Sequence, residues 1–255
     1  MTYGSLFSGI GGIDLGFDRA GMRCVWQVEN NKHRQQVLAK HWPNVRRHGD
    51  VETFPPTQAE DWYADVICGG FPCQNISLSG GMEGIELGEQ SGLWREFARI
   101  VRVLRPRFVV VENVAALTIS VDGKPAPIGR VLGDLAACGF DAEWDCLPSS
   151  AFGAFAERDR AFILAYRPAL DGRAHDLLEE SRERRASLQS GRLHRMAVAT
   201  RGKQPGARLE REPELARLVH GVSRRTHELD RLEGLGNCVD PRVSEFIGRR
   251  LMNAN

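Results

Sequence analysis

The stretch YGSLFSGIGG at residues 3–12 decides the fold, because an apolar run that reads as a strand breaks directly into a turn rich in glycine. Residues 13–20 follow with the apolar spacing of a helix. Glycine lets the backbone pass close to a ligand at the mouth of a parallel sheet, where α/β folds bind nucleotides. The stretch therefore predicts the first βα unit of a Rossmann-like sheet.

The same alternation of short apolar runs and helix-like stretches continues outward from this unit. It predicts an α/β fold with a mostly parallel sheet and helices on both faces. We expect strands at residues 3–7, 24–28, 64–68, 108–111, 143–147 and 161–166, and helices at 13–20, 31–41, 92–104, 127–138 and 243–251.

Composition limits the classes of protein that remain possible. The 255 residues contain 34 Lys plus Arg and 33 Asp plus Glu, so no overall charge excess indicates a polyanionic partner. No apolar run approaches the roughly 20 residues of a membrane span, and no leader-like segment opens the sequence. Six single Cys residues lack zinc-ligand spacing. We expect a cytoplasmic protein with reduced thiols, no metal site and no membrane contact.

Residues 166–231 differ in composition from the rest of the chain, because they are rich in Arg and poor in apolar runs. Such a stretch is either a solvated helical surface or a region that contacts nucleic acid. We expect residues 1–165 and 232–255 to form the main α/β domain, with residues 166–231 as a small insertion.

A candidate cofactor site combines the glycine turn with acids that follow later strands. Glu29 ends the second expected strand, about 20 residues after the turn, where an acid that holds ribose hydroxyls is expected. Asp50 and Val51 follow a third strand and are candidates for contact with an adenine. The pattern fits NAD as well as S-adenosylmethionine.

A candidate reactive site centres on Cys73, which follows a strand and the sequence GGFP at residues 69–72. Glu112 follows the apolar run 108–111 and is expected at the same edge of the sheet, and Arg158 and Arg160 precede the last strand. Taken singly, a Cys is usually a core thiol, a Glu often caps a helix, and an Arg before a strand is usually a surface charge.

Together these segments resemble the C5-cytosine DNA methyltransferase family over nearly the whole chain. Five segments match the family's motifs in the family's order: the cofactor loop, the nucleophile loop, the glutamate motif, the paired arginines and the closing motif, found here at residues 5–12, 70–74, 112–114, 158–160 and 236–241. The resemblance implies a class I methyltransferase fold, with residues 166–231 as the target-recognition region.

The resemblance also implies the chemistry of the reactive site. Cys73 would add to C6 of a cytosine and convert the ring into a nucleophile at C5. Glu112 would bind the N3 edge and the exocyclic amino group, Arg160 would bind the O2 edge, and Arg158 would support the loop or a phosphate.

Cofactor and partners follow from the same resemblance. The methyl donor would be S-adenosylmethionine, and the partner would be double-stranded DNA, from which the target base is flipped out. Residues 76–92 would close over that base. We expect a monomer without an obligate protein partner. The implied cofactor contacts are Phe7, Gly9, Gly11, Glu29, Asp50, Val51, Pro72, Leu93 and Asn237.

Departures from the family pattern keep other functions open. Phe155-Ala156-Glu157 stands where a Pro, a polar residue and a basic residue are usual, and Asn30 and Ser5 replace other common residues. The alternatives are an RNA cytosine-5 methyltransferase acting on tRNA, and a catalytically impaired member that binds DNA. An NAD-dependent oxidoreductase ranks last, because it leaves Cys73, Glu112 and both arginines without roles.

Overall fold

The computed structural model describes residues 1–72, 90–120, 123–154, 158–168, 178 and 237–254. Within these residues a sheet of seven strands has the order β3-β2-β1-β4-β5-β7-β6. Its strands are β1 (Thr2–Leu6), β2 (Arg23–Val28), β3 (Arg46–His48), β4 (Val66–Gly70), β5 (Phe108–Val114), β6 (Asp141–Pro148) and β7 (Asp159–Tyr166). The longer helices are α1 (Gly12–Arg19), α2 (Lys32–His41), α3 (Gln90–Leu104), α4 (Ile128–Ala137) and α8 (Pro241–Asn253).

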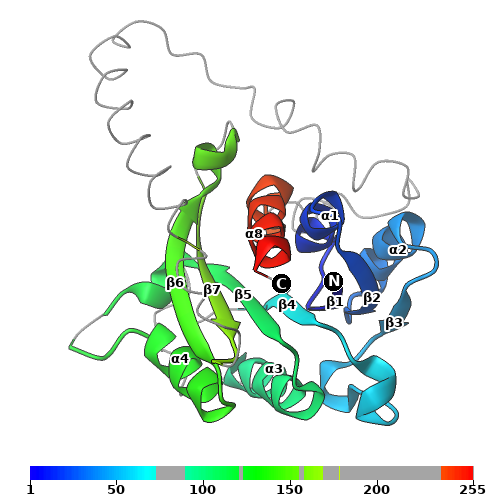
Figure 1. Cartoon of the computed structure of the whole chain (residues 1–255), viewed down its shortest axis with the longest axis horizontal. Helices are drawn as coiled ribbons and strands as arrows, with labels where there is room; N and C mark the ends of the chain where they lie inside the picture. Colours follow the sequence, from blue (N-terminus) through cyan, green and yellow to red (C-terminus); the bar gives the residue numbers. More distant parts are fainter. Residues whose placement is uncertain (73–89, 121–122, 155–157, 169–177, 179–236, 255) are drawn as a thin grey trace, which may run out of the picture.

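The sheet is parallel from β3 to β5, and β7 alone runs antiparallel to its neighbours β5 and β6. The central strands β1, β4 and β5 are buried along nearly their whole length, as strands covered on both faces must be, and most of their residues are apolar or glycine. The predicted mostly parallel α/β fold with helices on both faces is confirmed (Figure 1).

Two apolar cores lie on opposite faces of this sheet. One contains Phe17 of α1, Leu38 of α2 and Ile247 of α8, and the other contains Trp94 of α3 and Val131 of α4. Figure 1 shows α1, α2 and α8 above the sheet and α3 and α4 below it. The carboxyl ends of the parallel strands therefore remain open between two helical layers.

Helices α1 and α8 approach each other closely through glycines. A Cβ on Gly16 would lie 2.4 Å from the Pro241 carbonyl oxygen, and a Cβ on Gly248 would lie 2.8 Å from the Ala20 Cβ. These short distances mean that neither position accepts a larger residue without displacing a helix. The segment 237–254 is thereby fixed beside the start of the chain.

Two predicted strands end at least two residues later than expected. The strand predicted at residues 64–68 is Val66–Gly70, because the Asp65 carbonyl accepts from the Arg107 and Phe108 N–H groups before the ladder begins. Strand β5 continues through Val114, so Glu112 pairs within the sheet instead of following it. Gly70 and Glu112 are consequently partners across two neighbouring strands.

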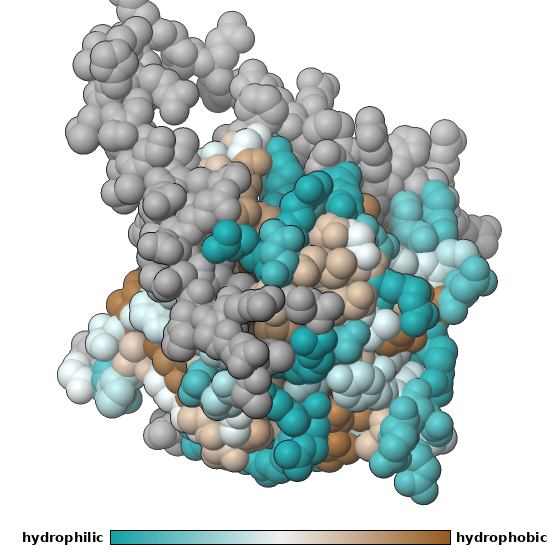
Figure 2. All heavy atoms as spheres, viewed as in Figure 1, coloured by the Kyte–Doolittle hydropathy of each residue, from teal (hydrophilic) through white to brown (hydrophobic). Residues whose placement is uncertain are grey.

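The surface carries no membrane-spanning element among the residues that the structure describes, since no helix there is both long and apolar enough. Figure 2 shows hydrophilic side chains interspersed with small apolar patches on the described part of one face. Among the described residues, the large apolar side chains that are exposed are Tyr63, Val103, Ile119 and Trp144.

Candidate functional site

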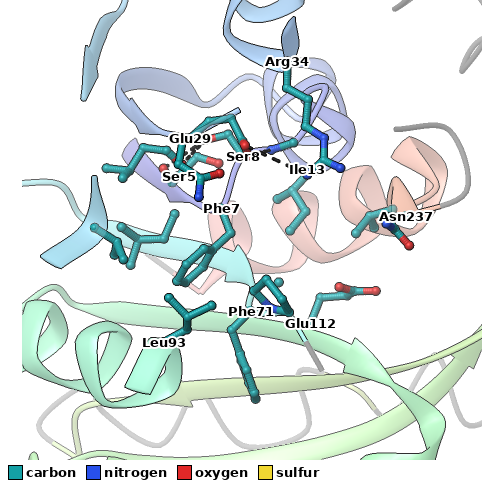
Figure 3. A pocket seen from close by; sticks show the side chains of 18 of the residues that line it. Ser5, Phe7, Ser8, Ile13, Glu29, Arg34, Phe71, Leu93, Glu112 and Asn237 are labelled. Atoms are coloured by element: carbon teal, nitrogen blue, oxygen red, sulfur yellow. Dashed lines mark hydrogen bonds and ion pairs between the residues drawn. The ribbon is translucent and has the colours of Figure 1, made fainter. Parts of the chain in front are cut away.

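A cavity of about 590 Å³ opens at the carboxyl ends of β1, β2, β4 and β5. This volume lies within the range of sites that enclose a small organic ligand. Figure 3 shows Glu29 and Arg34 at the top of the cavity, Glu112 and Asn237 at its right, and Phe7 and Leu93 at its left. The predicted site residues that line it are Phe7, Gly9, Glu29, Asp50, Val51, Pro72, Leu93, Glu112, Arg160 and Asn237.

The glycine turn after β1 contains two residues in the left-handed conformation, which Gly9 adopts readily and which is uncommon for a bulky residue such as Phe7. Phe7 has φ 52° and Gly9 has φ 59°, which directs the backbone of the turn toward the cavity. Gly11 does not line the cavity. A Cβ on Gly11 would lie 2.5 Å from the Trp42 ring, so this glycine permits packing between α1 and α2.

Glu29 connects the end of β2 to the glycine turn. Its carboxylate accepts from the Gly9 N–H at 2.8 Å and from the Asn31 N–H at 2.9 Å, and its side chain is only 5% exposed. The Arg34 guanidinium lies 4.0 Å from the same carboxylate. Each carboxylate oxygen retains a second lone pair, so Glu29 can also accept from ligand hydroxyls in the cavity.

Asp50 and Val51 form a second wall of the cavity after β3. Asp50 accepts from the Glu52 N–H at 2.9 Å and so begins a short 3₁₀ helix, Val51–Thr53. Arg99 of α3 donates to the carbonyls of Val51 at 3.1 Å and Phe54 at 2.6 Å. These bonds hold the turn in place from behind, which is a role that the sequence did not reveal for Arg99.

Glu112 and Arg160 form an ion pair at the opposite end of the cavity. Their closest oxygen and nitrogen atoms are 2.9 Å apart, with 9% and 22% of the two side chains exposed. Burial raises the pKa of Glu112, and the positive charges of Arg160 and Arg158 oppose this effect. The carboxyl group is thus kept available in its protonated form at a higher pH than an exposed glutamate.

Arg158 lies near this pair without lining the cavity. Its positive charge lowers the pKa of Glu112, and it also opposes the burial that raises the pKa of the Cys238 thiol to about 12. The two predicted arginines therefore differ in position. Arg160 lines the cavity, whereas Arg158 does not line it and affects Glu112 through its positive charge.

Asn113 is a residue of the glutamate motif to which the sequence assigned no role. Its side-chain N–H donates to the Phe71 carbonyl at 3.1 Å, and Phe71 and Pro72 line the cavity. This bond ties the end of β5 to the segment after β4. In the sequence, the feature that could have identified Asn113 is its position next to Glu112.

Other lining residues also escaped prediction. Arg34 stands in the first turn of α2, and Glu29 lies five residues earlier, before the helix begins, so no helical spacing relates the two in the sequence. The remaining unpredicted lining residues include Ser5, Ser8, Phe71, Cys238 and Val239.

Several predicted features lie outside the described residues. They are Cys73, the segment 76–92 as far as residue 89, the departure at 155–157, and nearly all of the region 166–231. Pro72 lines the cavity, so the described backbone reaches the cavity one residue before Cys73. The role of Cys73 stays a prediction.

The cavity suits an adenosine-containing cofactor. A carboxylate stands beside a glycine turn at the end of β2, Asp50 and Val51 follow β3, and Phe7 and Leu93 add apolar surface. The carboxylate matches the ribose hydroxyls of such a cofactor. Asp50 and Val51 match the polar edge of an adenine, and the apolar side chains match the faces of its ring. Among the described residues, no cluster of His, Cys, Asp or Glu could hold a metal ion.

The strand order and this cavity define a Rossmann-like α/β domain of the methyltransferase type. The sequence profile of the C-5 cytosine-specific DNA methylases matches residues 1–210. The chain belongs to this family, as its motifs predicted. The family's methyl donor is S-adenosylmethionine, which agrees with the cofactor expected from the sequence.

Individual relatives support the assignment. The type II methyltransferase M.NgoFVII of Neisseria gonorrhoeae is 34% identical over 163 residues, covering 64% of this chain and 43% of that protein. M.HhaI of Haemophilus parahaemolyticus is 29% identical over 171 residues, covering 67% of this chain and 50% of that protein. The chain thus spans about half, or less, of the length of these relatives.

Solved structures resemble this chain in fold. A candidate DNA modification methyltransferase encoded within an E. coli prophage superposes with a TM-score of 0.67 and 19% identity, covering 99% of both chains. The DNMT2 protein of Spodoptera frugiperda superposes with a TM-score of 0.55 and 21% identity, covering 67% of this chain and 51% of that one. At these identities the likeness concerns the fold alone.

Proposed function

We propose that this protein is a DNA (cytosine-5)-methyltransferase, which transfers the methyl group of S-adenosylmethionine to C5 of a flipped-out cytosine in duplex DNA. One observation carries the proposal: a single cavity is lined by both the Glu29 and glycine-turn site and the Glu112 and Arg160 pair. An adenosine site and a site for a pyrimidine edge thus share one space.

The cofactor would be held by the described wall of the cavity. Glu29 accepts from the ribose hydroxyls, Asp50 and Val51 contact the adenine, and Phe7 and Leu93 supply apolar surface. The backbone around Gly9 approaches the amino-acid end, and Pro72 and Asn237 close the remaining side. When bound, S-adenosylmethionine supplies an electrophilic methyl group.

Cys73 acts as the nucleophile in this proposal. Its thiolate forms a bond to C6 of the cytosine, and the electron pair released from the C5–C6 double bond makes C5 nucleophilic. After C5 has been methylated, loss of the C5 proton restores the double bond and expels the thiolate. The basis for assigning this role is the resemblance of residues 70–74 to the family's nucleophile loop.

Glu112 and Arg160 bind the pyrimidine during this addition. Burial raises the pKa of Glu112, which favours a carboxyl group able to donate a hydrogen bond to N3 as negative charge develops on the ring. The 2.9 Å contact with Arg160 would orient that carboxyl group, and in this proposal the guanidinium donates to the O2 edge. Arg158 adds positive charge behind the pair.

DNA is the proposed partner, and residues 166–231 are the proposed recognition region, set between the two parts of the catalytic domain at 1–165 and 232–255. Arginines in such a region bind phosphates and guanine edges. We propose that the protein acts as a monomer and without an obligate protein partner. Size-exclusion chromatography with light scattering tests that expectation.

The decisive experiment measures methyl transfer and covalent trapping together. Purified protein is incubated with tritiated S-adenosylmethionine and duplex DNA, with tRNA as a parallel substrate, and with duplex DNA containing 5-fluorocytosine. We expect labelled duplex DNA and a stable protein–DNA adduct, both abolished by Cys73→Ser, which still binds cofactor. Labelling of tRNA alone would assign the protein to RNA, and duplex binding without labelling or adduct would indicate an impaired member.

Bisulfite sequencing of DNA from cells that express the protein adds the recognition sequence. The expected result is protection of cytosine at a defined short site. Uniform conversion at every cytosine, in cells that contain the folded protein, would oppose DNA methylation by this chain.

A further inference from the structure

A buried carboxylate lies directly beneath the cofactor turn. Asp14 is the third residue of α1, the helix that begins at the end of the glycine turn, and its exposed fraction is 0%. It does not line the cavity. An ionisable group in this position reaches neither solvent nor ligand, so its contribution has to pass through the residues that it contacts.

The Asp14 carboxylate joins the two strands that lead into the cofactor site. One oxygen accepts from the Ser5 hydroxyl at 3.0 Å, and the other accepts from the Gln27 side-chain N–H at 2.8 Å. Ser5 and Gln27 are paired across β1 and β2. A single side chain on α1 therefore fixes the end of both strands at one level.

Each of these strands delivers a cofactor-binding element two residues later. Ser5 precedes Phe7, which starts the left-handed turn, and the Ser5 carbonyl accepts from the Ser8 hydroxyl at 3.0 Å. Gln27 precedes Glu29, whose carboxylate accepts from Gly9. The spacing between the turn and the ribose-binding acid thus depends on the pair that Asp14 joins.

Among the described residues, no positively charged side chain faces Asp14. The titratable groups that face it are Tyr3 of β1, Cys24 of β2, Cys68 of β4, Asp18 of α1 and Cys238 before α8. Burial is the main cause that raises the pKa of Asp14 to about 6, and hydrogen bonds from Gln27 and Ser5 oppose it. An ionised carboxylate without a counter-charge is costly to bury, so a neutral side chain would serve folding better.

We propose that Asp14 is a positioning residue for the methyl-donor site, and that its hydrogen bonds with the Ser5 and Gln27 side chains hold the glycine turn and Glu29 in the arrangement that binds the cofactor. The inference rests on the proposed function, because it assigns the cavity to S-adenosylmethionine. Asparagine has one acceptor oxygen and one donor group, so Asp14→Asn leaves either Ser5 or Gln27 without its acceptor.

The test compares Asp14→Asn with Asp18→Asn. Asp18 lies one turn further along α1 and accepts from Tyr3 and Trp42, so it shares the helix face without joining the strands. Calorimetry with S-adenosylhomocysteine at pH 7.5 measures cofactor affinity, and thermal unfolding checks the fold. We expect Asp14→Asn to raise Kd about tenfold, Asp18→Asn to change it less than threefold, and both variants to remain folded.

A pH series separates positioning from simple loss of packing. Between pH 8 and pH 5 the wild-type protein should lose affinity as Asp14 takes up a proton, while the Asp14→Asn variant should show a smaller change. Ser5→Ala removes one of the two bonds and should raise Kd about threefold, which provides a second reading if Asp14→Asn fails to fold.

Outcomes separate the two proposals. Wild-type protein that binds S-adenosylhomocysteine, together with unchanged affinity in folded Asp14→Asn or in Ser5→Ala, overturns the role of Asp14 and leaves the methyltransferase assignment intact. Folded wild-type protein that does not bind S-adenosylhomocysteine overturns both.

Discussion

Gly70 and Glu112 face each other across β4 and β5, and the space that a side chain at residue 70 would need is occupied by the Glu112 carboxylate. A Cβ built on Gly70 would lie 2.4 Å from Oε2 of Glu112. The second glycine after the strand predicted at 64–68 is therefore a component of the site, because it allows a carboxyl group to remain between two strands and beside Arg160.

Gly70→Ala should reduce methyl transfer by at least about tenfold, because the added methyl group displaces the Glu112 carboxyl from Arg160. The measurement is the rate of tritium incorporation into duplex DNA at saturating cofactor. Gly133→Ala is the matched control, since it lies inside α4 with no atom within 4 Å of the added Cβ. That control should leave the rate unchanged and raise the free energy of unfolding by roughly 0.5–1 kcal/mol. Equal rates for Gly70→Ala and wild type would show that the carboxyl position is unimportant.

Glu112→Gln should lower the rate of methyl transfer by about 100-fold or more while leaving the Kd for S-adenosylhomocysteine within threefold of wild type. Glutamine keeps the shape of the side chain but removes the acidic proton that is proposed to meet N3. Single-turnover kinetics combined with calorimetry distinguish chemistry from binding. A Glu112→Gln variant with normal single-turnover rate would remove Glu112 from the mechanism.

Glu29→Gln should weaken cofactor binding by about tenfold or more. The carboxylate of Glu29 receives backbone N–H groups on both of its oxygens, and glutamine can satisfy only one of them. Glu52→Gln makes the same chemical change at an exposed acid on the cavity wall, where we expect less than a twofold effect. Calorimetry measures the Kd for the cofactor in both variants. A similar loss of affinity in both would show that the negative charge of the cavity, and not the specific hydrogen bonds of Glu29, supports binding.

Stability should depend on pH through Asp14. Burial raises the pKa of this group from its ordinary value of 3.8 to about 6, so the folded state holds more protons than the unfolded state between about pH 4 and pH 6. The contribution of Asp14 to the free energy of unfolding therefore falls as pH rises through this window, by about 3 kcal/mol in total, and is level above it.

Urea denaturation of wild type and Asp14→Asn at pH 4.5, 5.5, 6.5 and 7.5 checks this prediction. The difference between the two proteins should shift in favour of the variant as pH rises and then become constant. Glu112, whose pKa is also raised, leaves a slope of the same sign in both proteins. A constant difference across the whole range would show that Asp14 does not titrate in this window.

The glycine turn and the alternation of apolar runs were sufficient to predict the sheet and most of its helices. Local sequence carries this information because strand burial and helix periodicity repeat at fixed intervals. The strand that ends at Gly70 shows the limit, since glycine normally indicates a turn and only its partner Glu112 explains why the strand continues.

Predictions of the cofactor site depended on motif order, and eight of the nine predicted cofactor residues line the cavity, as do Glu112 and Arg160. Gly11 was predicted to contact the cofactor but does not line the cavity. It packs against the Trp42 ring, which is brought close by tertiary packing that no local pattern encodes. The same is true of Arg99, whose contacts with Val51 and Phe54 join segments about 45 residues apart along the chain. Asp14 also has no sequence signal, since its partners lie on two different strands.

The close packing of the segment 237–254 against α1, at Gly12, Gly16 and Gly248, has a consequence for biosynthesis. Asn237, Cys238 and Val239 complete a cavity whose first wall is translated before residue 13, and the arginine-rich insertion is made between these two events. A ribosome-bound chain that has not yet reached residue 237 lacks one wall of the methyl-donor pocket. Under the proposed function, competence to modify DNA should therefore arrive only after the segment proposed to choose the target has been synthesised.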